Sequence, residues 1–212
     1  MAVPVAVEEV LRRGLDAFAE LGYEQTSVRE LARRVGVSHN FFHDRFGSKF
    51  GFWRAVVDFA IAEADPLTGP DDDRLDDAEL LRETVRRFYR GAATRPQLPR
   101  LIWDETARES ERLDYLAENY IRPVLAAVTP SVDRLVAAGR IPPIPMHLLY
   151  FVVTGAASGM IQAPLARRIG RPEATSTDDL VATADALALR VLDGAIPTLS
   201  PATHPSDAGG RS

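Results

Sequence analysis

The residues best suited to specific recognition lie in one short stretch, Ser38–Lys49. Asn40 carries an amide that can pair bidentately with the edge of an adenine, and hydroxyl, imidazole and ammonium groups stand close to it in the sequence. His39 and His43 are four residues apart, a spacing that also suits two zinc ligands on one helical face. There is no cysteine, and no third ligand other than Asp44 lies near them. The pattern therefore favours hydrogen bonding and charge recognition over metal binding.

Other catalytic and metal-binding patterns do not occur in the sequence. The chain has no cysteine, which excludes a disulfide, a thiolate metal site and a cysteine nucleophile. The segment Gly155–Gly159 (GAASG) does not have the arrangement of a serine nucleophile elbow, and no phosphate-binding glycine loop is present. The acidic stretch Asp65–Glu79 lacks the glycine and the spacing of a calcium loop. We therefore predict that the protein is not an enzyme, needs no cofactor and binds no metal.

The distribution of charge along the chain predicts an anionic partner for one segment. The net charge is −5, but residues 25–54 contain six basic and two acidic side chains, a net +4 that leaves −9 for the rest. This segment also contains Lys49, the only lysine beside 24 arginines. A basic segment on an acidic protein is typical of a part that meets a polyanion, although an arginine-rich solvated helix face has the same composition.

Helical periodicity and capping residues predict two helices before the Ser38–Lys49 stretch. Apolar residues at helical spacing mark an amphipathic helix from Val7 to about Gly22. Ser27 and Glu30 form the capping-box pattern that opens a second, short helix. This helix ends at Gly36, where a glycine can take the positive φ that turns the chain sharply.

A third helix follows directly and is capped by Ser38. Phe42 and Phe46 stand one turn apart and are expected to face the core, so the polar side chains of this helix would point outward. Ser48 then caps a fourth helix over about Lys49–Ala64. A short helix, a glycine turn and another short helix form a candidate helix-turn-helix unit.

With these elements in place, the segment Val10–Val57 resembles the DNA-binding domain of the tetracycline-repressor-like (TetR) family of bacterial regulators. The resemblance rests on several short motifs in the family's order: Phe18 with Gly22-Tyr23, Thr26-Ser27-Val28, Leu31-Ala32 with Gly36-Val37-Ser38, and Phe46-x-Ser48-Lys49. It implies a second, larger helical domain that holds a small-molecule cavity and a dimer interface. In the family, the lysine after Phe-x-Ser lies at the start of the fourth helix beside the DNA backbone. The resemblance thus implies a phosphate contact for Lys49, which the helix dipole and a compact ammonium both favour.

The chain departs from the family pattern inside the recognition helix. Asn40 stands where a glycine is common, Phe42 and His43 replace a leucine and a tyrosine, Arg45 replaces a histidine, and Phe50 replaces an acid. Because the tyrosine commonly meets phosphate, His43 must take over that contact or it is lost. Residues at the start of the recognition helix enter the major groove, so His39 and Asn40 are the candidates for base contacts. The predicted DNA-binding residues are Ser27, Ser38, His39, Asn40, His43, Arg45 and Lys49.

The rest of the chain predicts an all-α protein of about nine helices. We expect a helix-turn-helix DNA-binding domain over residues 1–48, an effector-binding and dimerisation domain over 49–196, and a flexible tail over 197–212. Pro123 and Pro130 must kink or divide the longest helix of the larger domain. The helices expected in that domain after the acidic loop span residues 77–93, 98–110, 111–138 and 178–193.

Residues 141–166 contain no charged side chain, and their length could span a bilayer. Four prolines, a histidine and several small polar residues dilute the apolar character, and Gly155-x-x-x-Gly159 suits close helix packing in water as well as in lipid. We therefore expect this segment to be buried at a subunit interface, where it would form a four-helix bundle with the helix over residues 178–193. A membrane-associated protein anchored by residues 141–166 is the alternative.

These features together predict a homodimeric TetR-like repressor that binds a palindromic DNA operator and is released by an unknown small-molecule effector. The start of the chain lacks a secretory signal, so we expect a cytoplasmic protein. A ligand carrier or enzyme that does not bind DNA is a further alternative. The polar or amphipathic side chains that could line an effector cavity are Trp103, Tyr115, Asn119, Tyr120, Tyr150 and Gln162.

Overall fold

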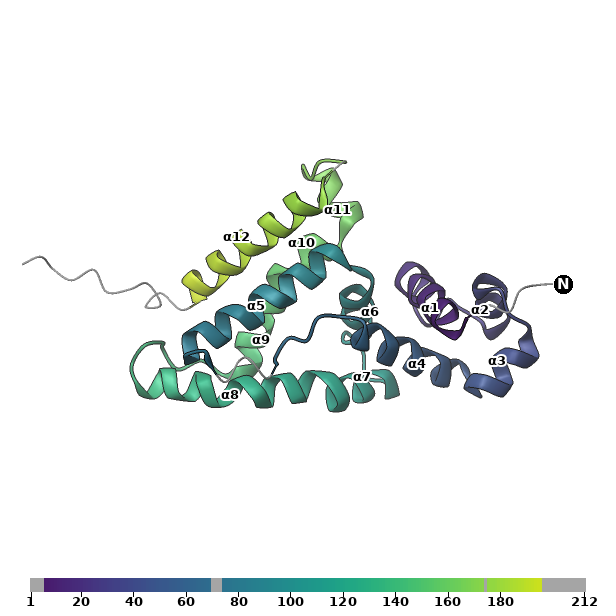
Figure 1. Ribbon diagram of the computed structural model, residues 1–212, viewed down its shortest axis with the longest axis horizontal. Helices are drawn as coiled ribbons and strands as arrows, with labels where there is room; N and C mark the ends of the chain where they lie inside the picture. Colours follow the sequence, from purple (N-terminus) through teal and green to yellow (C-terminus); the bar gives the residue numbers. More distant parts are fainter. Residues whose placement is uncertain (1–5, 70–73, 174, 196–212) are drawn as a thin grey trace, which may run out of the picture.

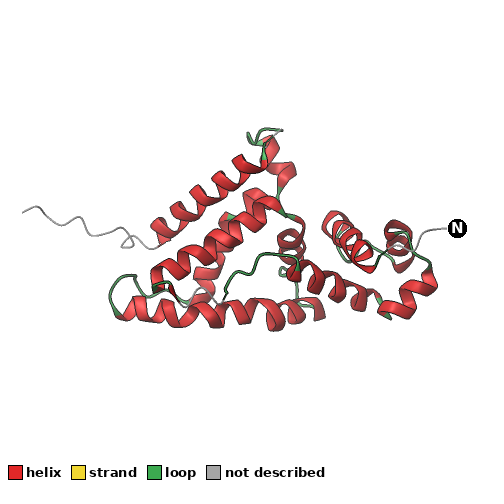
Figure 2. Ribbon diagram, viewed as in Figure 1, coloured by secondary structure: helices red, strands yellow, loops and turns green. Residues whose placement is uncertain are grey.

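The structure, a computed structural model, describes residues 6–69, 74–173 and 175–195. Figure 2 shows helices joined by loops, with no strand in these ranges. In Figure 1, α1, α2 and α3 gather at one end, and α4 leads from them to a larger group of helices with a triangular outline. The predicted all-α fold is confirmed, while the expected tail over residues 197–212 lies outside the described part of the chain.

The N-terminal domain, defined here as α1–α3, forms the helix-turn-helix unit that the capping residues predict. Ser27 Oγ accepts a hydrogen bond of 3.1 Å from the amide of Glu30, and Ser38 Oγ accepts one of 3.0 Å from that of Phe41. Gly36 lies between the two helices in the left-handed region, with φ 82° and ψ 31°. These local bonds fix the start of each helix and the turn between them. The helices are α1 Val7–Leu21, α2 Val28–Val35 and α3 His39–Phe46.

The predicted capping box at the start of α2 forms only in part. Ser27 caps the helix, but the Glu30 carboxylate accepts hydrogen bonds of 2.6 and 3.0 Å from the guanidinium of Arg33. An ion pair one turn later on the same helix face thus takes the carboxylate that the box would use.

Helix α4, Lys49–Ala62, shares the apolar core of the N-terminal domain. Phe52 and Trp53 are fully buried among side chains of α1–α3, and the same cluster reaches Leu101 and Leu116 of the following helices. Gly14 of α1 provides the close approach that this packing requires. A Cβ there would lie 2.5 Å from Phe52 Cζ.

The body, defined here as α5–α12, is organised around α5, Asp77–Thr94. This helix packs against α12, Thr177–Ala195, and against α8, Arg122–Ala137, as Figure 1 shows. A complete capping box of Asp76 with Glu79 starts α5. The core on its inner face includes Leu81, Val85, Tyr89, Leu135, Leu149, Ala184 and Leu192.

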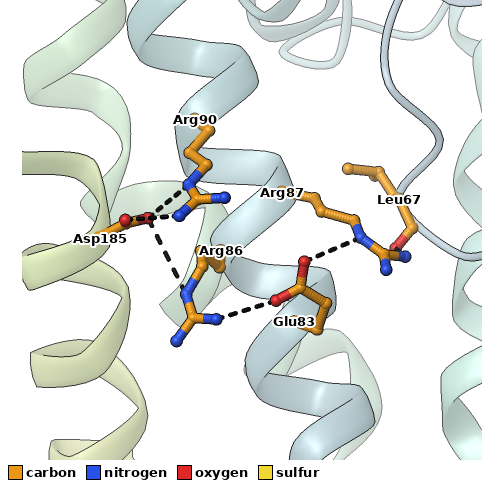
Figure 3. Close-up of polar contacts among 6 residues, drawn as sticks. All are labelled: Leu67, Glu83, Arg86, Arg87, Arg90 and Asp185. Atoms are coloured by element: carbon orange, nitrogen blue, oxygen red, sulfur yellow. Dashed lines mark hydrogen bonds and ion pairs between the residues drawn. The ribbon is translucent and has the colours of Figure 1, made fainter. Parts of the chain in front are cut away.

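Ion pairs tie the outer surface of α5 to its neighbours. Figure 3 shows Arg90 making two hydrogen bonds of 2.7 Å to Asp185 of α12, while Arg86 lies beside both Asp185 and Glu83. Glu83 also pairs with Arg87 on the same helix, at 3.1 Å. The polar seam between α5 and α12 therefore continues the apolar contact between them out to the surface.

The long helix expected over residues 111–138 forms one helical run, which a π-helical turn interrupts just before Pro123 and which Pro130 does not divide. Helix α6, Gln97–Glu105, is followed by α7, Glu111–Leu116, and by the π-helical turn η2, Ala117–Ile121. Helix α8 continues from this turn without a break, so the π-helical turn directly precedes Pro123, which has no backbone N–H to donate. Pro130 lies inside α8 at an exposed position.

Residues 141–166 form three short helices rather than one span. They are α9 Met146–Ala156, α10 Ser158–Ile161 and α11 Ala163–Arg168. Within the described residues, no helix combines the length and the apolar character needed to cross a bilayer. This division, together with the assignment of residues 111–138 to both α7 and α8, accounts for the helices beyond the nine or so expected.

Candidate nucleic-acid interface

Helix α3 presents a polar face away from its own core. Phe42 is fully buried, and its ring centroid lies 4.8 Å from that of Phe52. His39, Asn40 and His43 are exposed on the opposite side of the helix, as the sequence predicts. In Figure 1, α3 lies at the end of the molecule remote from α5 and α12. Its exposed face is therefore free to enter a groove without contacting the body.

The N-termini of α2 and α3 offer hydrogen-bond donors at the same end of the protein. Ser27 and Ser38 are both exposed, and the hydroxyl oxygen of each accepts a hydrogen bond from a backbone amide. The hydroxyl proton of each remains able to donate outward. Helix N-termini also favour an anion through the helix dipole.

His43 is held by a bond that decides its tautomer. Its Nδ1 lies 2.8 Å from the carbonyl oxygen of Gly47, and because a carbonyl only accepts, Nδ1 must carry a proton. In the neutral ring, Nε2 is then an acceptor. A phosphate also offers acceptors only, so Nε2 can donate to it only from the doubly protonated ring. His43 therefore differs from a tyrosine, whose hydroxyl can donate without a change of charge.

The unpaired positive charge of this region is smaller than the sequence suggests. Arg33 pairs with Glu30 at 2.6 Å, and Arg34 pairs with Glu20 at 2.7 Å. Arg45 is exposed, and no carboxylate within the described ranges forms an ion pair with it. The same holds for Arg29, in the first turn of α2, which the sequence analysis did not select. Its position two residues after the cap Ser27 is the signal that could have identified it.

Lys49 has partners inside the protein that the sequence did not indicate. Its ammonium donates to the carbonyl oxygens of Tyr23, at 2.9 Å, and Thr26, at 2.8 Å. It also lies 4.0 Å from the centroid of the Tyr23 ring. Burial lowers the pKa of Lys49 from its usual value. An ammonium can direct its donors at two carbonyls of one tight loop, whereas a planar guanidinium is larger and forked, which gives a reason for a lysine here.

Two of the three N–H donors of Lys49 are thus used within the chain. Its phosphate contact stays a prediction that depends on the third.

Comparison with known proteins identifies this arrangement. The model of the family described as "Bacterial regulatory proteins, tetR family" matches residues 10–56, the span from α1 into α4 that carries the geometry above. Residues 10–56 are thus similar to the TetR family of bacterial regulatory proteins.

Solved structures of transcriptional regulators share the fold over nearly the whole chain. The TetR family transcriptional regulator PfmR from Thermus thermophilus is 19% identical, with a TM-score of 0.65 over 90% of this chain and 97% of that one. The ketosteroid transcriptional regulator KstR2 of Mycobacterium tuberculosis is 18% identical, with a TM-score of 0.65 over 92% and 97%. No curated protein matches the sequence. At these identities the likeness shows the fold and does not identify a ligand of the body.

The six effector candidates do not gather at one place in the body. Tyr115 and Tyr120 lie together, since both hydroxyls donate to the same carboxylate oxygen of Asp58 on α4. Burial and the Asp58 carboxylate raise the pKa of Tyr120. Asn119 lies between them in sequence but donates to the backbone oxygen of Tyr115, at 2.8 Å.

The other three candidates are scattered. Trp103 is exposed on α6, Gln162 is exposed between α10 and α11, and Tyr150 is partly buried on α9, where burial raises its pKa. A cleft of about 120 Å³ lies beside α11 and contains none of the six. Its lining is Ala163, Arg167, Arg171, Pro172, Glu173 and Thr175.

Two functional-looking polar groups were missed by sequence reasoning. Asp58 is a single acid among the apolar residues of α4, and that isolation is the only signal it gives. Tyr89 lies in the body core and donates to the carbonyl oxygen of Val153 at 2.8 Å, with a pKa raised by burial to about 12. A tyrosine at a buried position of an amphipathic helix has no sequence feature that reveals its partner.

A metal site is not supported by the geometry of the described residues. No group of three or more His, Asp or Glu side chains in these ranges comes close enough to hold an ion.

Proposed function

We propose that this protein is a cytoplasmic transcriptional repressor of the TetR family that binds a palindromic DNA operator as a homodimer. The two copies of α3 would lie in successive major grooves about 34 to 36 Å apart. The observation that carries this proposal is the exposed polar face of α3, capped by Ser38 and anchored from behind by the buried Phe42.

The residues around α3 divide into two roles. His39 and Asn40, in the first turn of the recognition helix, would contact base edges and specify sequence. The residues that would position the DNA backbone are Ser27, Ser38, His43, Arg45 and Lys49, with Arg29 added on the evidence of its exposure. His43 would make its phosphate contact in the doubly protonated state, because Nδ1 is committed to Gly47.

The dimer interface is proposed for α9 and α12. These helices pack against each other and leave large apolar side chains exposed: Leu148 (48%), Phe151 (62%), Val152 (43%) and Leu189 (43%). Such a cluster on a water-exposed surface is typical of an interface between chains. A two-fold axis across it would pair α9 and α12 with their copies in a four-helix bundle.

An effector would release the operator through the body. A ligand that binds one conformer of the body more tightly than another shifts the population toward it, and DNA affinity falls if that conformer sets the two α3 helices at the wrong spacing. The six predicted side chains remain candidates for that site. Tyr115 and Tyr120 are favoured among them because they meet on α4, the helix that shares the core of the N-terminal domain.

Selection from a random duplex pool at moderate salt tests the proposal, with the variant Asn40→Ala. Asn119→Ala is the matched control, since Asn119 is the other asparagine of the chain and lies on the body. We expect a palindromic motif whose half-sites change with Asn40→Ala and not with Asn119→Ala.

A folded protein that enriches no DNA motif would refute the proposed function as a transcriptional regulator and would favour a ligand carrier or an enzyme. A motif that is unaffected by Asn40→Ala would refute the base contact alone.

A further inference from the structure

The N-terminal domain meets the body at a compact group of charged and aromatic side chains. Tyr23 and Glu24 lie in the loop between α1 and α2, and Arg112 lies on α7 of the body. Figure 1 shows α6 and α7 beside α4, where the two parts of the protein meet. We call this group the junction, and its remaining members are Lys49 and Glu105.

Arg112 contacts both parts of the protein at once. Its guanidinium carbon lies 3.8 Å from the centroid of the Tyr23 ring, and its Nη2 donates to Glu24 at 2.7 Å. Within the body, its Nε donates to Glu105 of α6 at 2.6 Å. The side chains of Arg112 and Glu105 are each only 11% exposed, whereas that of Glu24 is 60% exposed. Burial opposes the charged form of Arg112, but the two carboxylates raise its pKa overall.

The buried pair with Glu105 already balances the charge of Arg112 inside the body. The contacts to Tyr23 and Glu24 are therefore additional, and they join chain segments 88 residues apart. These contacts are made to the same loop in which Lys49 donates hydrogen bonds to the carbonyl oxygens of Tyr23 and Thr26. The Tyr23 ring thus contacts two cations, Lys49 of α4 and Arg112 of α7.

This loop decides where the DNA-binding helices start. Thr26 bonds back to Tyr23 through both its amide, at 3.2 Å, and its hydroxyl, at 2.8 Å. The next residue is Ser27, the cap of α2. A displacement of the Tyr23–Thr26 turn would therefore move the N-terminus of α2, and α3 with it, relative to the body.

We propose that Arg112 is a positioning residue for DNA binding, which holds the Tyr23–Ser27 loop so that α2 and α3 keep a fixed orientation on the body. This inference rests on the proposed DNA-binding function, and it adds a residue remote from DNA to the residues that determine affinity. Arg112 does not contact the operator, so its loss reduces the population of correctly oriented domains and leaves the base contacts unchanged.

The expected effect follows from the contacts that are lost. A cation–π contact and one partly exposed charge pair together correspond to about tenfold in an equilibrium constant. Because a dimer needs both N-terminal domains in place, operator affinity would fall by up to about tenfold for each domain, which is up to about hundredfold for the dimer. The salt dependence of binding would not change, since no phosphate contact is removed.

Hydrogen exchange of the Thr26 amide tests the proposal without DNA, using the full chain and Arg112→Ala. Arg122→Ala is the matched control, because Arg122 pairs with Glu118 on the nearby η2–α8 segment at 68% exposure. We expect exchange at Thr26 to accelerate about tenfold in Arg112→Ala, with α5 and α12 unaffected and with no change in Arg122→Ala. Unchanged exchange at Thr26 in a folded Arg112→Ala protein would overturn the proposal.

Removing Arg112 leaves Glu105 buried without its partner, so two milder variants keep the test decisive if Arg112→Ala does not fold. Arg112→Lys retains a charge for Glu105, and Glu24→Gln alters only an exposed side chain. Faster exchange at Thr26 in both supports the proposal, and wild-type exchange in both overturns it.

Operator affinity then separates this inference from the proposed function. If the wild type selects an operator, we expect Arg112→Ala to weaken it with an unchanged salt slope and an unchanged motif, whereas wild-type affinity would refute the positioning role. If the wild-type protein selects no operator, the proposed function is refuted, and hydrogen exchange at Thr26 still tests whether Arg112 positions the loop.

Discussion

Replacing Gly14 with alanine is expected to destabilise the core between α1 and α4. A Cβ at this position would lie 2.5 Å from Phe52 Cζ and 2.7 Å from Val56 Cγ2, about 1 Å closer than carbon atoms normally pack. Phe52 and Val56 are both fully buried, so neither can move aside without disturbing other core contacts. The helix itself would gain from the exchange, since alanine is the better helix former.

The two effects can be weighed against each other. Overpacking a buried site costs about 1 to 3 kcal/mol, whereas glycine to alanine inside a helix contributes about 1 kcal/mol of stability. The expected net loss in the free energy of unfolding is about 0 to 2 kcal/mol. Gly91→Ala on α5 isolates the helix effect, because Gly91 is exposed and a Cβ there meets nothing within 4 Å. That variant should be more stable than the wild type by about 0.5 to 1 kcal/mol.

Urea unfolding followed by tryptophan fluorescence measures both changes. Trp53 is fully buried in the same core, and Trp103 is the only other tryptophan. In a Trp103→Phe background the signal therefore reports on the core that contains Gly14. A Gly14→Ala protein that gains as much stability as Gly91→Ala would refute the close α1–α4 approach. A Gly91→Ala protein that loses stability would refute the estimate of the helix effect.

Three further changes test other contacts. Gly51→Ala should cost more than Gly14→Ala in the same assay, because its Cβ would clash with the backbone oxygen of Phe46, which cannot rotate away; a smaller loss would contradict this. Arg134 lowers the pKa of Asp77, so this pair stabilises the protein above the usual value of 3.8 and loses its effect as pH falls through the lowered pKa. Asp77→Asn should therefore lower the melting temperature by about 1 to 2 °C at neutral pH, and a difference that persists in acid would count against the pair. Phe151→Glu should yield monomers by light scattering while Trp103→Glu on α6 stays dimeric, and a dimer in both would exclude α9 from the interface.

Lys49, the only lysine in the sequence, shows what the family resemblance could predict and what it could not. Its position in the Phe46-x-Ser48-Lys49 motif was sufficient to place it at the start of α4, and the structure confirms that place. The motif did not indicate that the ammonium binds the carbonyls of Tyr23 and Thr26. A phosphate contact and a structural role can coexist, since a lysine has three donors.

The sequence by itself determined the elements of the DNA-binding unit. Ser27, Gly36, Ser38 and Ser48 each act on the backbone within three residues, through a side-chain cap or a left-handed turn. Such signals are local, so they can be interpreted without knowing what the helix will pack against. The interruption of the long helix just before Pro123 follows from the same kind of reasoning, because proline acts on the turn that precedes it.

Only the tertiary structure decided which side chains meet across the chain. The Glu24 carboxylate reaches Arg112 across 88 positions, and the hydroxyls of Tyr115 and Tyr120 reach Asp58 from about sixty positions away. Nothing in the spacing of these residues encodes the contact, because their distance is set by how α4, α6 and α7 pack on one another. The helices could therefore be predicted from short-range preferences, whereas the junction that holds the N-terminal domain on the body depends on the packing of the whole fold.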